Sequence, residues 1–211
     1  MSVAGSASIN AEGYSGESLN KGSGFSMGNQ LTFSGSGELD NGMTVSLSFV
    51  LDQGDDSSAA STAVMAGAPF DSHSVTVSSD ALGTLKFSGE GGASSASSID
   101  TSAAGDIWDT FDGSRGAVTA VAVTDSATGN NSVFYTLPTL MDGLSINASY
   151  KPQASSRESG TGYGVSYTGI DGLTASYATS DIVGSTAALS GDQTVWKLAY
   201  AYGPITATAS S

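Results

Sequence analysis

The sequence predicts an all-β fold of antiparallel, up-and-down strands, and three of its features lead to this prediction. Tight turns recur, strands of alternating apolar and polar residues follow them, and the connections at the opposite strand ends are much longer. Asn-Gly and Asp-Gly pairs supply the positive φ that two-residue hairpin turns need. The glycines of the five turns are Gly42, Gly83, Gly143, Gly172 and Gly203.

Alternation is clearest after the first turn, where Met43, Val45 and Leu47 alternate with Thr44 and Ser46. A period of two residues gives each strand one apolar and one polar face. The same pattern predicts eleven strands along the chain. They are expected over residues 6–14, 25–39, 43–52, 72–79, 84–88, 132–139, 144–151, 163–168, 173–178, 194–201 and 205–210.

The long connections and the polar faces indicate a transmembrane β-barrel. Short turns at one end and long loops at the other are typical of such barrels, whereas a soluble sandwich mixes its loop lengths. The polar faces carry hydroxyl and amide groups, which suit a water-filled lumen better than a charged, solvated surface. Aromatic residues near strand ends fit either an interfacial girdle or the general preference of strands for aromatics. They include Tyr14, Tyr150, Tyr177, Tyr200 and Tyr202.

Composition excludes several classes of protein. The 211 residues include 20 acidic and 6 basic side chains, for a net charge of -14. Nucleic acid is therefore a poor partner, because phosphate binding needs clustered Lys and Arg. Cations, calcium above all, are plausible partners, although acidity also serves solubility alone. The chain has no cysteine, so it forms neither disulfides nor thiolate metal sites. No apolar run approaches the roughly 18 residues of a transmembrane helix.

Four segments together resemble the general-diffusion porins of alphaproteobacteria. They are the hairpin of residues 6–39, the turn Asp40-Asn41-Gly42-Met43, the strand entry Asn131-Ser132-Val133-Phe134-Tyr135, and the acidic-aromatic segment of residues 105–113. The resemblance implies a barrel of about 16 strands in the outer membrane of a Gram-negative bacterium. It also implies a homotrimer in contact with the lipid bilayer and lipopolysaccharide.

The resemblance further implies that residues 1–211 form a single barrel domain whose third external loop, 89–131, folds into the lumen. Asp106, Asp109 and Asp112 would be the acidic side of the constriction, and Trp108 and Phe111 would hold the loop against the wall. From spacing alone, one helical turn would place the three carboxylates on one side. They could equally be calcium ligands or cap a surface helical turn.

A second candidate calcium site consists of Asp52, Asp55 and Asp56. Calcium is coordinated by six to eight oxygen atoms, so three carboxylates are only part of a site. No cofactor is expected to be required.

The expected lumen wall includes Glu12, Gln30, Lys86 and Lys197, with the two lysines as the main basic candidates. Porins of this type often face the acidic loop with an arginine cluster, and none is visible here. The strand count is also odd, whereas bacterial barrels have even counts. Together with a last strand that lacks a terminal aromatic, this leads us to expect the N-terminal two thirds of a barrel, with about five strands missing.

Catalysis has little support, because the single histidine, His73, has no recognisable triad partners. We therefore expect no enzyme. The favoured function is a passive, cation-leaning channel for small hydrophilic solutes and ions. The alternative is an exported, calcium-linked structural or adhesive β protein. Lipid demands apolar faces about 25 Å tall on every strand, and the expected strands 84–88 and 163–168 look short for that.

Overall fold

The computed structural model describes residues 1–14, 22–52, 72–99, 131–152, 158–184 and 190–211. These residues contain eleven strands, as predicted. The strands are β1 (Ser2–Tyr14), β2 (Gly22–Glu38), β3 (Thr44–Asp52), β4 (Ser72–Ser79), β5 (Gly83–Glu90), β6 (Ser132–Thr136), β7 (Leu144–Lys151), β8 (Ser159–Tyr167), β9 (Leu173–Val183), β10 (Gly191–Tyr202) and β11 (Ile205–Ser210).

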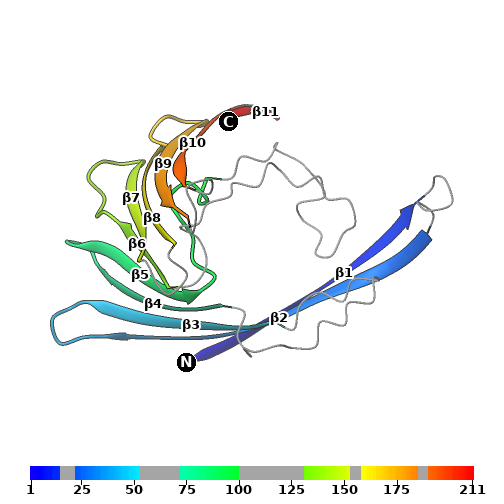
Figure 1. Ribbon diagram of the computed structural model, residues 1–211, viewed down its shortest axis with the longest axis horizontal. Helices are drawn as coiled ribbons and strands as arrows, with labels where there is room; N and C mark the ends of the chain where they lie inside the picture. Colours follow the sequence, from blue (N-terminus) through cyan, green and yellow to red (C-terminus); the bar gives the residue numbers. More distant parts are fainter. Residues whose placement is uncertain (15–21, 53–71, 100–130, 153–157, 185–189) are drawn as a thin grey trace.

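One sheet contains all eleven strands, and each strand pairs with its neighbours in chain order. Every ladder is antiparallel, which confirms the all-β, up-and-down fold. Figure 1 shows the sheet curving into a trough with β1 and β11 at its two edges. Within the described ranges, no helix has the length and apolarity needed to cross a membrane.

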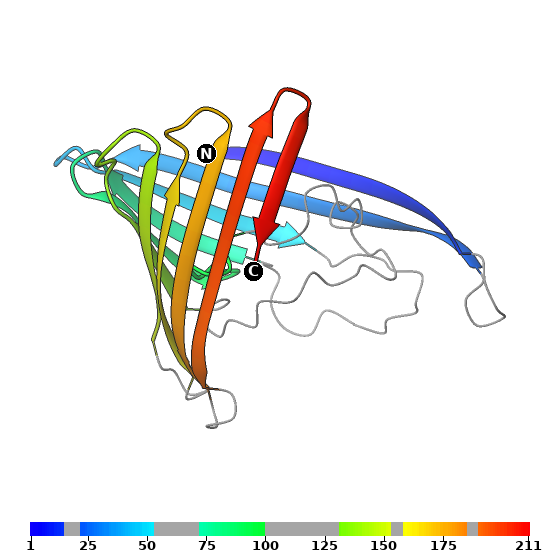
Figure 2. The ribbon, with the colours of Figure 1, turned by 90° about the horizontal axis from the view of Figure 1, so that it is seen from above.

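The tight turns gather at one end of the sheet, as Figure 2 shows for the hairpins of β7 to β11. All five turn glycines have positive φ, between 58° and 81°. Neighbouring hairpins are joined by backbone hydrogen bonds at this end. The Thr168 amide donates to the Gly143 carbonyl at 2.8 Å, and the Ala201 amide donates to the Gly172 carbonyl at 2.8 Å. The turns therefore form a continuous rim.

The predicted ends of eight strands were wrong, including those of β8 and β9. β8 begins at Ser159 rather than Tyr163, and β9 continues to Val183, because Ser159 and Val183 pair at the end of an unbroken ladder. A glycine-rich stretch that suggests a loop is therefore strand. β8 has nine residues and β5 has eight, close to the 9–11 residues of a transmembrane strand. The two strands expected to be short are therefore longer than predicted, whereas β6 has five residues and β11 has six.

The ladder register keeps one face polar and the other apolar across the sheet. Large apolar side chains stay exposed on the apolar face, including Trp196 at 41 % and Val165 at 38 %. Others on this face are Val3, Leu31, Leu47, Val75, Phe87, Tyr163, Tyr177 and Leu198. Because a soluble monomer rarely exposes so continuous an apolar surface, this face needs a non-aqueous environment.

Candidate functional site

The polar face lies on the concave side of the trough and is lined mainly by hydroxyl groups. A row of serines crosses six neighbouring strands, β1 to β6, through directly paired positions. Its members are Ser2, Ser34, Ser48, Ser74, Ser88 and Ser132. Such a surface offers hydrogen bonds to water and to polar solutes without adding fixed charge.

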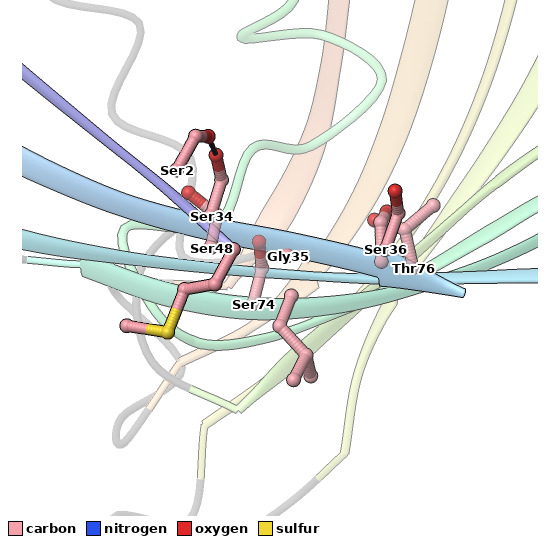
Figure 3. A pocket seen from close by; sticks show the side chains of 10 residues that line it. Ser2, Ser34, Gly35, Ser36, Ser48, Ser74 and Thr76 are labelled. Atoms are coloured by element: carbon pink, nitrogen blue, oxygen red, sulfur yellow. Dashed lines mark hydrogen bonds between the residues drawn. The ribbon is translucent and has the colours of Figure 1, made fainter.

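Part of this row lines an open hollow of about 450 Å³ over β2, β3 and β4. Figure 3 shows the hydroxyl groups of Ser34, Ser36, Ser48 and Ser74 that surround it. The Ser2 and Ser34 hydroxyl oxygens are 2.7 Å apart and share a hydrogen bond. Sequence reasoning identified the polar alternation of single strands, but not the register that joins them into one wall.

Three lysines share the polar face. Lys86 pairs with Thr76 and Phe134, Lys151 pairs with Gly160, and Lys197 pairs with Ser176 and Ser210. The Lys86 side chain is exposed, whereas those of Lys151 and Lys197 are half-buried. The register therefore places both expected wall lysines on one face and adds Lys151 to them; Phe134 is the one aromatic neighbour that pairs with these lysines.

The remaining expected wall residues lie on β1 and β2. Gln30 is exposed, pairs with Asp52 of β3, and donates from Nε2 to Thr32 Oγ1 at 3.3 Å. Glu12 pairs with Gly24 in the β1–β2 ladder, and its side chain lies outside the described part.

The expected constriction and calcium residues lie almost wholly outside the described residues. These are Asp106, Asp109, Asp112, Trp108 and Phe111, together with Asp55 and Asp56. Asp52 is the last residue of β3. Among the residues that the structure describes, no group of three His, Asp or Glu side chains could hold a metal ion. These assignments stay predictions.

The chain after β5 packs onto the polar face instead of leaving the sheet. Residues 95–98 form a turn in which the Ser98 amide donates to the Ser94 carbonyl at 3.0 Å. The Ser97 amide donates to Ser94 Oγ at 3.0 Å, and the Ser94 amide donates to Ser97 Oγ at 2.8 Å. These local hydrogen bonds give the segment 94–99, called here the inner segment, a fixed shape.

The inner segment contacts β7, β9 and β10. The Ser95 amide donates to Ser149 Oγ of β7 at 2.9 Å, and both residues are buried. Ala96 is fully buried against Ala178 and Val195, and Ile99 packs on the same cluster. This is the principal apolar cluster of the described residues, and Ala178 and Val195 place it on the polar face of the sheet.

Gly162 of β8 completes the contact. A Cβ atom there would lie 2.6 Å from Ser149 Oγ, 2.8 Å from Ser180 Oγ and 3.3 Å from Ser95 Cβ. No side chain fits between the wall and the inner segment at this point. Sequence reasoning missed these residues, and the only available signal was the Gly-x-Gly-x-Gly spacing that gives a strand one face without side chains.

A family model for Gram-negative porins matches residues 1–211, the whole chain. The chain belongs to the Gram-negative porin family. The protein is therefore an outer-membrane channel for passive diffusion, and the alternative of an adhesive or structural protein is not favoured.

Solved structures with a similar chain path include two multiply substituted Rh. blastica porins. The first has 14 % sequence identity and a TM-score of 0.47, covering 99 % of this chain and 82 % of that one. The second has 16 % identity and a TM-score of 0.47, covering 97 % and 83 %. A chain described under "Asymmetric conductivity of engineered proteins" has 17 % identity and a TM-score of 0.49, covering 99 % and 82 %. No curated protein matches by sequence.

In a porin the two faces of the sheet have distinct roles. The exposed apolar face contacts the hydrocarbon of the outer membrane, and the hydroxyl-lined concave face contacts the water that carries small solutes. The inner segment then stands on the water side, where it occupies part of the cross-section available to solutes.

Proposed function

We propose that this porin conducts small hydrophilic solutes and ions with a preference for cations, by size exclusion and local electric field. The observation that carries the proposal is the continuous hydroxyl-lined polar face across β1 to β6. Hydroxyl groups replace part of a solute's hydration shell without trapping it, which a diffusion pore needs.

Cation preference is proposed from the excess of 20 acidic over 6 basic residues. The three lysines of the polar face oppose it locally. We assign Asp106, Asp109 and Asp112 to the acidic side of the constriction opposite these lysines, with Trp108 and Phe111 holding the loop. The support for this assignment is that the inner segment, near the start of residues 89–131, contacts the wall on the lumen side.

The reversal potential across a planar bilayer in a KCl gradient tests the preference. We expect a sign that indicates faster passage of potassium, and a shift toward zero when all three carboxylates are replaced by Asn. An anion-selective wild-type channel would contradict the cation preference while leaving the channel itself established.

The same proposal includes a homotrimer, contact with lipopolysaccharide, no required cofactor, and calcium as an optional ligand of the acidic loops. We also propose that the protein has no catalytic activity. His73 supports this, because it lies on the apolar face, stacked on Phe49 with ring centroids 6.3 Å apart, away from the polar wall. Light scattering in detergent, with and without a calcium chelator, tests the trimer and its dependence on calcium.

A further inference from the structure

We infer that Ser149, Gly162 and Ser180 are positioning residues that hold the inner segment on the lumen wall. The placement of the inner segment then sets the width of the water-filled lumen at the level of this segment. The effect on pore width rests on the proposed channel function, but the contact between the inner segment and the wall can be tested separately.

The wall beneath the inner segment consists of small residues in two adjacent rows. Ser149, Gly162 and Ser180 form one row across β7, β8 and β9. Ala178 of β9 and Val195 of β10 belong to the next row and pack against Ala96. Because these side chains are short, the backbone of the inner segment approaches the sheet closely, and Ser94, Ser95 and Ala96 are completely buried.

A specific hydrogen bond fixes the position on this wall. The buried amide of Ser95 donates to the buried hydroxyl of Ser149 at 2.9 Å. Replacing Ser149 by alanine would leave that amide buried without this acceptor, which is costly. The contact is therefore directional as well as close, and it selects one placement of the inner segment.

Gly162 sets the depth of the contact. The space that a side chain of residue 162 would need is occupied by Ser149 Oγ, Ser180 Oγ and Ser95 Cβ. A methyl group at residue 162 must displace either the two wall hydroxyls or the inner segment. We expect the inner segment to yield, because the hydrogen-bonded ladders on both sides of β8 fix the wall.

Glycine-to-alanine variants of β8 test the inference in the full-length porin. Gly162→Ala is expected to change the single-channel conductance by roughly 1.2- to 2-fold and to add current fluctuations, because conductance follows the free cross-section of the pore. Gly164→Ala is the matched control. Its Cβ would meet Asn147 Oδ1 at 2.6 Å, the end of a flexible side chain, and none of its near neighbours belongs to the inner segment. Equal conductance in the wild type and both folded variants would overturn the inference.

A cysteine pair tests the contact without relying on conduction. The chain has no native cysteine, so Ser95→Cys with Ser149→Cys introduces the only two thiols. After oxidation of the folded protein, we expect both thiols to be absent when the protein is denatured and labelled with maleimide.

Two free thiols in the folded, oxidised protein would overturn the inference. A disulfide in a protein that conducts nothing would support the contact and contradict the channel function, so the two failures are distinguishable.

Discussion

Charged residues of both signs lie on the polar face of the described strands, because the register places Glu12, Glu38 and Asp52 there as well as three lysines. Lys86, Lys151 and Lys197 lie on three different strands, and their paired neighbours are Ser, Thr and Gly residues together with Phe134. A cation passing this wall meets repulsion that the carboxylates elsewhere in the chain must offset. Each lysine is therefore expected to lower cation selectivity in proportion to its exposure to the water path.

Lys86 gives the cleanest test of this effect, because its side chain is exposed. Lys86→Gln is expected to raise the cation-to-anion permeability ratio, measured from reversal potentials, with an effect that weakens as salt screens the charge. Asp192→Asn is the control, since Asp192 is exposed on the apolar face. An unchanged permeability ratio in Lys86→Gln, or an equal change in the control, would contradict the assignment of Lys86 to the lumen wall.

At the scale of elements, the tight turns determine where each hairpin reverses. Gly83 has φ +79°, and a Cβ there would collide with the Thr136 carbonyl oxygen of β6. Gly42 has a similar φ of +81° but no neighbour within 4 Å of its Cβ position. The two glycines thus share a backbone conformation and differ in crowding.

We expect Gly83→Ala to lower stability more than Gly42→Ala. Both variants lose about 1 kcal/mol through the left-handed backbone, and only Gly83→Ala also separates β5 from β6. Urea unfolding of the refolded barrel, followed by gel mobility with and without heating, measures the difference. Equal midpoints would show that the contact between the β4–β5 turn and β6 contributes nothing.

The strands show which parts of the fold could be predicted from the sequence. Alternation with turn glycines predicted all eleven strands, and the bounds of β4, β7 and β11 match. β8 was predicted too short because its first residues, which include Gly160 and Gly162, resemble a loop. The lack of a side chain at Gly162 is instead a packing requirement of the inner segment, because Ser95, more than 60 residues earlier, lies 3.3 Å from the Cβ position. The glycine at every second residue is the only local sign of a contact so distant in sequence, and it does not identify the partner segment.

For the whole molecule, the central feature is a single sheet with one apolar and one polar face. The sequence predicted both faces from periodicity, because the alternation is local and uninterrupted. It could not predict the serine row or the row of Ser149, Gly162 and Ser180, since both depend on the register between strands. The residues expected at the constriction lie outside the described part, so their role stays a prediction.

The two faces can be distinguished by placing one charge on either side of the same strand. Val165→Arg puts a charge on the apolar face, whereas Ser166→Arg puts it on the polar face one residue later. A charge in lipid costs up to about 2–4 kcal/mol at the bilayer centre. We therefore expect Val165→Arg to reduce folding yield in liposomes and Ser166→Arg to fold normally. Equal yields would contradict the assignment of the faces.

The most direct test of a water-filled outer-membrane channel is single-channel recording of the detergent-purified protein in a planar lipid bilayer. We predict stepwise, ohmic current increases whose size scales with the conductivity of the bathing salt, as a water-filled pore requires. A folded protein that inserts without producing such steps, or that stays soluble without detergent and never inserts, would contradict the account.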